Sequence, residues 1–114
     1  MRYALLVCND DSADVTPAEQ AARFASYTAF ADTMLERGVL RDAGVRLRPT
    51  ITATTVRVRG GDVVIADGPF AETKEQIGGF YLIDCEDLDE AIEIASQVPS
   101  ARYGSIEVRP VWEM

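Results

Sequence analysis

The order of the predicted helices and strands is the feature that most restricts the fold of this chain of 114 residues. Two helical segments alternate with strand-like runs in the order β-α-β-β-β-α-β. Setting aside one short hairpin strand leaves β-α-β-β-α-β, which is the order of the ferredoxin-like split βαβ fold. We therefore predict a single α+β domain over residues 1–114, with an extra hairpin strand and with both helices on one face of an antiparallel sheet. The strand-like runs cover residues 3–8, 52–59, 62–66, 79–85 and 105–112.

The first helix has a strong predicted start. Thr16 is a suitable N-cap, Pro17 suits the first helical position, and Glu19 completes a capping box. The helix should then run to about Arg37, where Gly38 suits the left-handed position that follows a helix end. Its predicted apolar stripe consists of Phe24, Tyr27, Ala31, Met34 and Leu35.

The second helix and the hairpin turn have equally local signals. Asp87 is a predicted N-cap with Glu90 three residues later, and Pro99 should end that helix. The Gly60-Gly61 pair between two β-branched runs predicts a tight hairpin turn.

The central strands are apolar on both faces. A sheet with one face in water alternates apolar with polar residues. In the first strand, however, both faces are apolar. One face carries Tyr3, Leu5 and Val7, and the other carries Ala4, Leu6 and Cys8. A second subunit is the simplest cover for the second face, so we predict a homodimer, with its sheets packed face to face in a dimeric α/β barrel. Glu107 and Arg109 in the last strand either line a polar part of that sheet–sheet cavity or lie at an exposed edge.

Charge and composition exclude several classes of function. Asp and Glu outnumber Lys and Arg by 19 to 11, giving a net charge of −8, which argues against nucleic acid and anionic membranes as partners. No apolar run approaches the roughly 20 residues of a membrane span, and no secretory signal is visible, so we expect a cytoplasmic protein.

The chain contains no histidine, which removes Ser-His and Cys-His nucleophile pairs and the commonest metal ligand. The alternating acids of the loop at 10–14 lack the glycine and the final glutamate of an EF-hand loop. We therefore predict neither a metal nor another cofactor. Acid–base chemistry would have to use Asp, Glu, Tyr, Lys or Cys.

The most unusual connector is DGPFAETKEQIGGF, at 67–80. A turn aspartate usually accepts a hydrogen bond from the N–H two residues later, but for Asp67 that residue is Pro69, which has none. Asp67 therefore either bonds the N–H of Phe70 or stays free for a ligand. We expect the Phe70 ring to be buried as an anchor, and Lys74 to be the cation beside Asp67.

The segment from DGPFAETKE to DEAIEIA, with ATTVRVR before it and SIEVRPV after it, resembles a DGPF-type member of the YCII-related family over nearly the whole chain. The resemblance implies the dimeric ferredoxin-like barrel. It also implies mostly uncharacterised relatives, some thought to be small enzymes built on a His–Asp pair, and an association with extracytoplasmic-function sigma factors. The acid of that pair would map to Asp67. The histidine would fall near Ser26 or Tyr27, where this chain has none.

Three functions follow as hypotheses. The first is a small acid–base enzyme of the lyase or isomerase type, in which Asp67 is the base and Tyr27 or Tyr81 donates a proton. The second is a non-catalytic dimeric module that binds a small ligand, with a possible regulatory link to a sigma factor. The third is a simple scaffold. In the first hypothesis the candidate anion-binding residues are Arg46, Arg48 and Arg109, with Lys74 beside the base.

Overall fold

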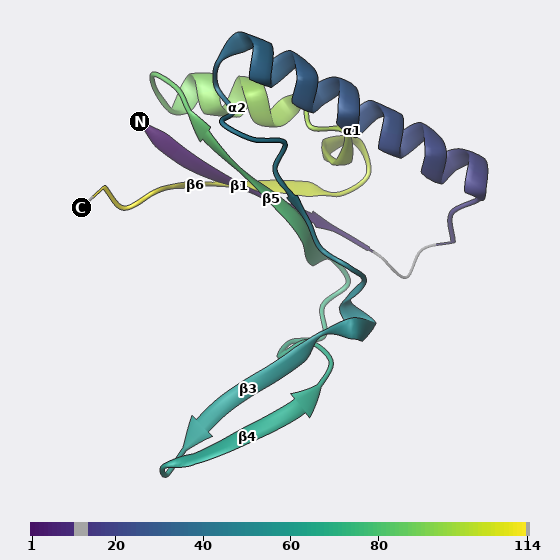
Figure 1. Cartoon of the computed structure of the whole chain (residues 1–114), viewed down its shortest axis with the longest axis vertical. Helices are drawn as coiled ribbons and strands as arrows, with labels where there is room; N and C mark the ends of the chain where they lie inside the picture. The colour runs from purple at the N-terminus through teal and green to yellow at the C-terminus, as the bar shows by residue number, and fades with distance from the viewer. Residues whose placement is uncertain (11–13, 114) are drawn as a thin grey trace.

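The computed structural model describes residues 1–10 and 14–113, so part of the acidic loop considered for calcium lies outside the described residues. Its body is a four-stranded antiparallel sheet in the order β2-β5-β1-β6, with both helices on one face (Figure 1). This order is that of a ferredoxin-like fold, and the predicted α+β class is confirmed. The elements are β1 (Arg2–Asn9), α1 (Pro17–Arg37), β2 (Val45–Arg46), β5 (Gln76–Asp84), α2 (Leu88–Ser96) and β6 (Ser105–Pro110).

The predicted helix ends are confirmed. The Thr16 side chain accepts a hydrogen bond from the Glu19 N–H at 3.1 Å, and Gly38 ends α1 in the left-handed conformation with φ of 83°. The Asp87 carboxylate accepts from the Glu90 N–H at 2.9 Å at the start of α2. Each cap satisfies a backbone group that the helix itself leaves without a partner.

The core lies between the helices and the sheet. The predicted stripe of α1 is only partly correct, since Phe24 is 62% exposed and Leu35 is also exposed, whereas Phe30 is buried against the Tyr81 ring. Phe24 is exposed because the first half of α1 extends past the strand ends, whereas the second half lies over the sheet (Figure 1). The largest fully buried core side chains are Leu5, Met34, Ile83, Ile94 and Val98.

The hairpin differs from its predicted place. Strands β3 (Thr54–Arg59) and β4 (Asp62–Asp67) form a separate two-stranded sheet, joined at the predicted turn by two glycines with positive φ. We predicted one extra strand, but both hairpin strands leave the main sheet and project on the side away from the helices (Figure 1). The two-residue strand β2 takes the sheet edge instead, pairing Val45 with Phe80 and Arg46 with Gly79.

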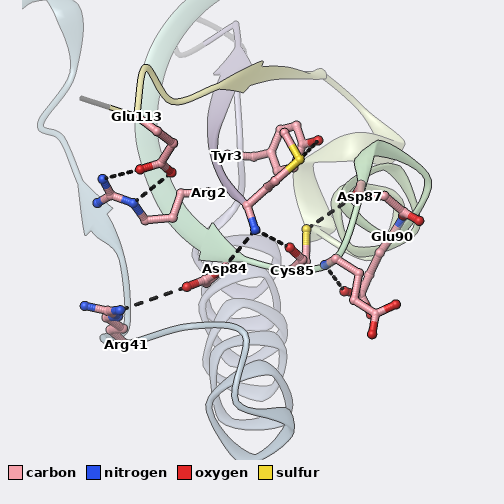
Figure 2. A network of polar contacts seen from close by, with 10 residues as sticks. Arg2, Tyr3, Arg41, Asp84, Cys85, Asp87, Glu90 and Glu113 are labelled. Carbon is pink, nitrogen blue, oxygen red and sulfur yellow. Dashed lines mark hydrogen bonds and ion pairs between the residues drawn. The ribbon is translucent and has the colours of Figure 1, made fainter.

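Polar contacts connect the first two residues of the chain to the end of β5 and to the C-terminal segment (Figure 2). The terminal ammonium of Met1 donates to the Cys85 carbonyl at 2.7 Å, and the Arg2 guanidinium makes two 3.2 Å hydrogen bonds to the Glu113 carboxylate. Both members of that pair are about half exposed, so water screens the pair and it contributes little to stability. Within 1–10 and 14–113, no helix is both long and apolar enough to cross a membrane.

Candidate functional site

A groove runs between α1 and the sheet edge formed by β2 and β5. Its volume is about 580 Å³, which is within the usual size range of small-molecule sites. Three tyrosines and three arginines distinguish its lining in a chain that is otherwise acidic. We call it the tyrosine–arginine groove after these residues, which are Tyr27, Tyr81, Tyr103, Arg23, Arg46 and Arg48.

Two glycines shape this groove by close approach. Gly44 precedes β2 with φ of 83°, and a Cβ there would lie 2.4 Å from the Tyr81 ring. Gly79 lies opposite Arg46, and its missing side chain lets the Val45 carbonyl come within the space that a Cβ would fill. Through these contacts the short strand β2 packs closely enough on β5 to hold Arg46 beside the tyrosines.

The tyrosines and Arg23 form a packed cluster at the α1 side of the groove. The Arg23 guanidinium lies over the Tyr103 ring, 4.0 Å from its centroid, a cation–π contact. Burial raises the pKa of Tyr27, as does a hydrogen bond with Tyr103, while Arg46 lowers it by less. Burial also raises the pKa of Tyr81. Both phenols are therefore neutral at physiological pH, and the Tyr27 phenol is already hydrogen-bonded to Tyr103.

This environment makes stability depend on Tyr27 at alkaline pH. Above about pH 10 the phenol ionises in the unfolded chain but keeps its proton in the fold. The folded state then binds more protons, so the free energy of unfolding falls as pH rises through this range. The free energy of unfolding, measured with urea, should fall between neutral pH and pH values above about 10. We expect this fall to be smaller for Tyr27→Phe than for wild type. An equal loss in both proteins would contradict the assigned environment.

Asp67 lies in a different place, a hollow of about 480 Å³ at the base of the hairpin. The carboxylate is exposed, and it makes no hydrogen bond or ion pair with any residue of the described ranges. The turn is held instead by the Gly68 N–H donating to the Ala53 carbonyl at 2.7 Å and by Thr55 donating to the Gly68 carbonyl at 2.7 Å. Of the two alternatives for Asp67, the bond from the Phe70 N–H is therefore absent, and ligand binding stays a prediction.

The expected burial of Phe70 is wrong, because its ring is 80% exposed. The loop is fixed without it: the Gln76 amide donates to the carbonyls of Ala71 and Thr73 at 2.8 and 3.2 Å. The polar side chain of Gln76 therefore fixes the loop, a role that we predicted for the Phe70 ring.

The structure divides the predicted site residues into three groups. Tyr27, Tyr81, Arg46 and Arg48 line the tyrosine–arginine groove. Asp67 and Lys74 line the hairpin hollow, and Asp10 is the one described residue that borders both this hollow and the groove. Arg109 borders neither.

Arg109 lies on edge strand β6, on the sheet face away from the helices. It pairs with Ala4 and Glu107 pairs with Leu6, so both charges share the open face with apolar side chains. The two form an exposed ion pair with an N–O distance of 3.9 Å. The two charges are therefore exposed on the edge strand, and their place in a sheet–sheet cavity stays a prediction.

Sequence reasoning missed Arg23 and Tyr103. Arg23 precedes Tyr27 by four residues, the helical spacing that places two side chains on one face. Tyr103 follows a short 3₁₀ turn, Pro99–Arg102, and nothing in the local sequence indicates that this turn returns to α1. Across residues 1–10 and 14–113, no three His, Cys, Asp or Glu side chains are grouped closely enough to hold a metal ion.

Comparison with known proteins finds similarity over the full length of the chain. A model of the YCII-related domain matches residues 1–114. The chain is also 44% identical over 117 aligned residues to a protein of Rhizobium meliloti (strain 1021), covering 97% of this chain and 92% of the relative. The name of that relative describes it only as uncharacterized.

Proposed function

The chain belongs to the YCII-related family, and from its groove we propose that it binds a small organic anion with an aromatic or other planar body. The observation that carries the proposal is the pairing of Arg46 and Arg48 with Tyr27 and Tyr81 in one groove of a chain with net charge −8. Guanidinium groups bind carboxylates through paired hydrogen bonds, and tyrosine rings offer flat apolar surface with a polar tip. The neutral Tyr81 phenol can donate a further hydrogen bond to the anion.

The proposal is tested with benzoate as a minimal aromatic carboxylate and benzamide as its neutral counterpart. We expect benzoate to shift the amide NMR signals of groove residues and to bind more tightly than benzamide. Arg46→Ala should weaken benzoate binding about tenfold or more, because it removes a charge-assisted hydrogen bond worth about 1.5–3 kcal/mol.

Arg57→Ala is the matched control, since Arg57 is an arginine of β3 outside the groove. Its benzoate affinity should equal that of wild type. Equal weakening by both substitutions would point to a general charge effect, and NMR shifts confined to other regions would reject the groove as the site.

Acid–base catalysis is a second candidate, supported by a separate observation. Asp67 has a carboxylate without a described partner, in a hollow that also contains Lys74. Such a carboxylate is accessible to a reacting group. In this candidate function Asp67 is the base and Lys74 is the cation in the same hollow, because Tyr27 lines the other cavity.

A further inference from the structure

We propose that Arg23 is a second anion-binding group of the tyrosine–arginine groove, so that the groove selects a planar molecule with two anionic groups, such as an aromatic dicarboxylate. The role of Arg23 rests on the proposed function of the groove, the binding of an organic anion, and it adds a second charge to that anion. Arg46 binds one anionic group from the β2 side of the groove, and Arg23 binds the other from the α1 side.

The groove arginines differ from many other arginines of the chain because no carboxylate neutralises them. Outside the groove, four arginines each form an ion pair with an aspartate or a glutamate, and these are Arg2, Arg37, Arg41 and Arg109. The three arginines of the groove form no ion pair with any carboxylate of residues 1–10 and 14–113, and this includes Asp10 and Asp32 of the groove itself. Guanidinium groups without a carboxylate partner are suited to bind an anion from solution.

Arg23 is held in place by an aromatic ring. Its guanidinium lies 4.0 Å from the centroid of the Tyr103 ring. This contact gives the N–H groups of Arg23 no oxygen acceptor, and no other residue in the described part of the chain accepts a hydrogen bond from them. An arginine that already lies on a ring loses less side-chain freedom when it binds a ligand than a fully mobile one does. Arg23 is therefore in position to bind an anionic group with all of its donors.

Arg23 and Arg46 act at separate points of the groove. The charge of Arg46 acts on the Tyr27 phenol. Arg23 precedes Tyr27 by four residues of α1, which is about 6 Å along the helix axis. The Tyr27 phenol is hydrogen-bonded to Tyr103, whose ring carries Arg23. Two separate cations beside a pair of aromatic rings match a flat ligand that carries an anionic group at each of two positions.

The charge of the whole chain makes the second cation necessary for such a ligand. The net charge of −8 repels a dianion more strongly than a monoanion. A dianion therefore binds well only where each of its charges meets its own guanidinium. Benzoate needs only one of the two, so Arg23 should affect dianions and leave benzoate unaffected.

Two ligands of nearly the same shape test the role of Arg23 by titration calorimetry on the full chain. Isophthalate has two carboxylates on one ring, and 3-carbamoylbenzoate has a neutral amide in place of one of them. We expect wild type to bind isophthalate about tenfold more tightly, the usual gain from one more charge-assisted hydrogen bond. Arg23→Ala should bind both ligands equally and should keep the wild-type affinity for benzoate, which shows that the groove is still folded.

Arg102→Ala is the matched control. Arg102 is the neighbour of Tyr103 in the chain and lies outside the groove, so its removal changes the net charge equally without removing a groove cation. Its preference for isophthalate should equal that of wild type. An equal loss of preference in Arg102→Ala and Arg23→Ala would indicate a general charge effect and would overturn the role of Arg23.

The remaining outcomes separate this role from the proposed function of the groove. If wild type binds benzoate through Arg46 but does not prefer isophthalate, the second anion-binding group is rejected and the proposed function stands. A preference for isophthalate that persists in Arg23→Ala also rejects Arg23. If wild type binds none of the three carboxylates, both the proposed function and the role of Arg23 are wrong.

Discussion

Replacing Gly79 with alanine is expected to destabilise the fold by about 1–3 kcal/mol, the usual cost of forcing an extra carbon into a packed site. A Cβ at Gly79 would lie 2.5 Å from the Val45 carbonyl oxygen, which is far inside contact distance. That oxygen belongs to the backbone of β2, so it cannot rotate away as a side-chain end could. Because β2 has only two residues, we expect it to detach from β5 and take Arg46 with it.

Gly78→Ala is the control, one residue away in the same strand. The nearest atom to a Cβ at Gly78 is the Asn9 side-chain oxygen at 3.2 Å, at the end of a side chain that can move. Its effect should stay within about 0.5 kcal/mol. Urea unfolding at one fixed protein concentration measures both, and benzoate titration shows whether only Gly79→Ala loses the groove. Equal free energies of unfolding for the two variants would show that β2 accommodates the extra carbon without loss of stability.

Local signals in the sequence predicted those parts of the fold that depend on local chemistry. The caps at Thr16 and Asp87 and the turn at Gly60-Gly61 use backbone groups within a few residues, so the sequence alone suffices for them. The element order then selected the ferredoxin-like arrangement. These choices agree with one another, which is what a sequence with a single folded state requires.

The strand β2 could not be predicted in this way. Two residues give no periodicity, and the VRLRP segment that contains Val45 and Arg46 has neither the length nor the pattern of a strand. Its position depends on Gly79, more than thirty residues later in the chain. The sequence instead predicted one extra hairpin strand, and the separation of both hairpin strands from the main sheet was missed.

The candidate site was predictable by residue type but not by grouping. The arginines and tyrosines were identified as anion binders and proton donors, and four of them share one groove. Asp67 was placed with them because the sequence gives no distance between a helix and a hairpin base. The structure separates them because β4, which ends at Asp67, belongs to a hairpin that leaves the main sheet (Figure 1).

For the acid–base candidate function, Asp67→Asn is expected to lower the rate by about 10²–10⁴-fold, the usual contribution of a positioned acid or base. Asparagine keeps the shape of the side chain but cannot accept the proton. Because the carboxylate has no described partner, the substitution should leave the fold and any dimer intact. Proton abstraction is measured without a known product, as exchange of C–H protons for deuterium in a panel of small organic acids in D₂O, followed by ¹H NMR.

The matched control is Glu72→Gln, which removes an exposed carboxylate from the same hollow. If Asp67 is the base, Glu72→Gln retains the wild-type exchange rate while Asp67→Asn loses it. If both variants exchange as fast as wild type, Asp67 is not the base and the free carboxylate has no catalytic role. A protein that only binds its ligand would instead bind benzoate in the groove and show no exchange above the solvent rate in any variant. The benzoate titration and the exchange assay together therefore distinguish the two candidate functions.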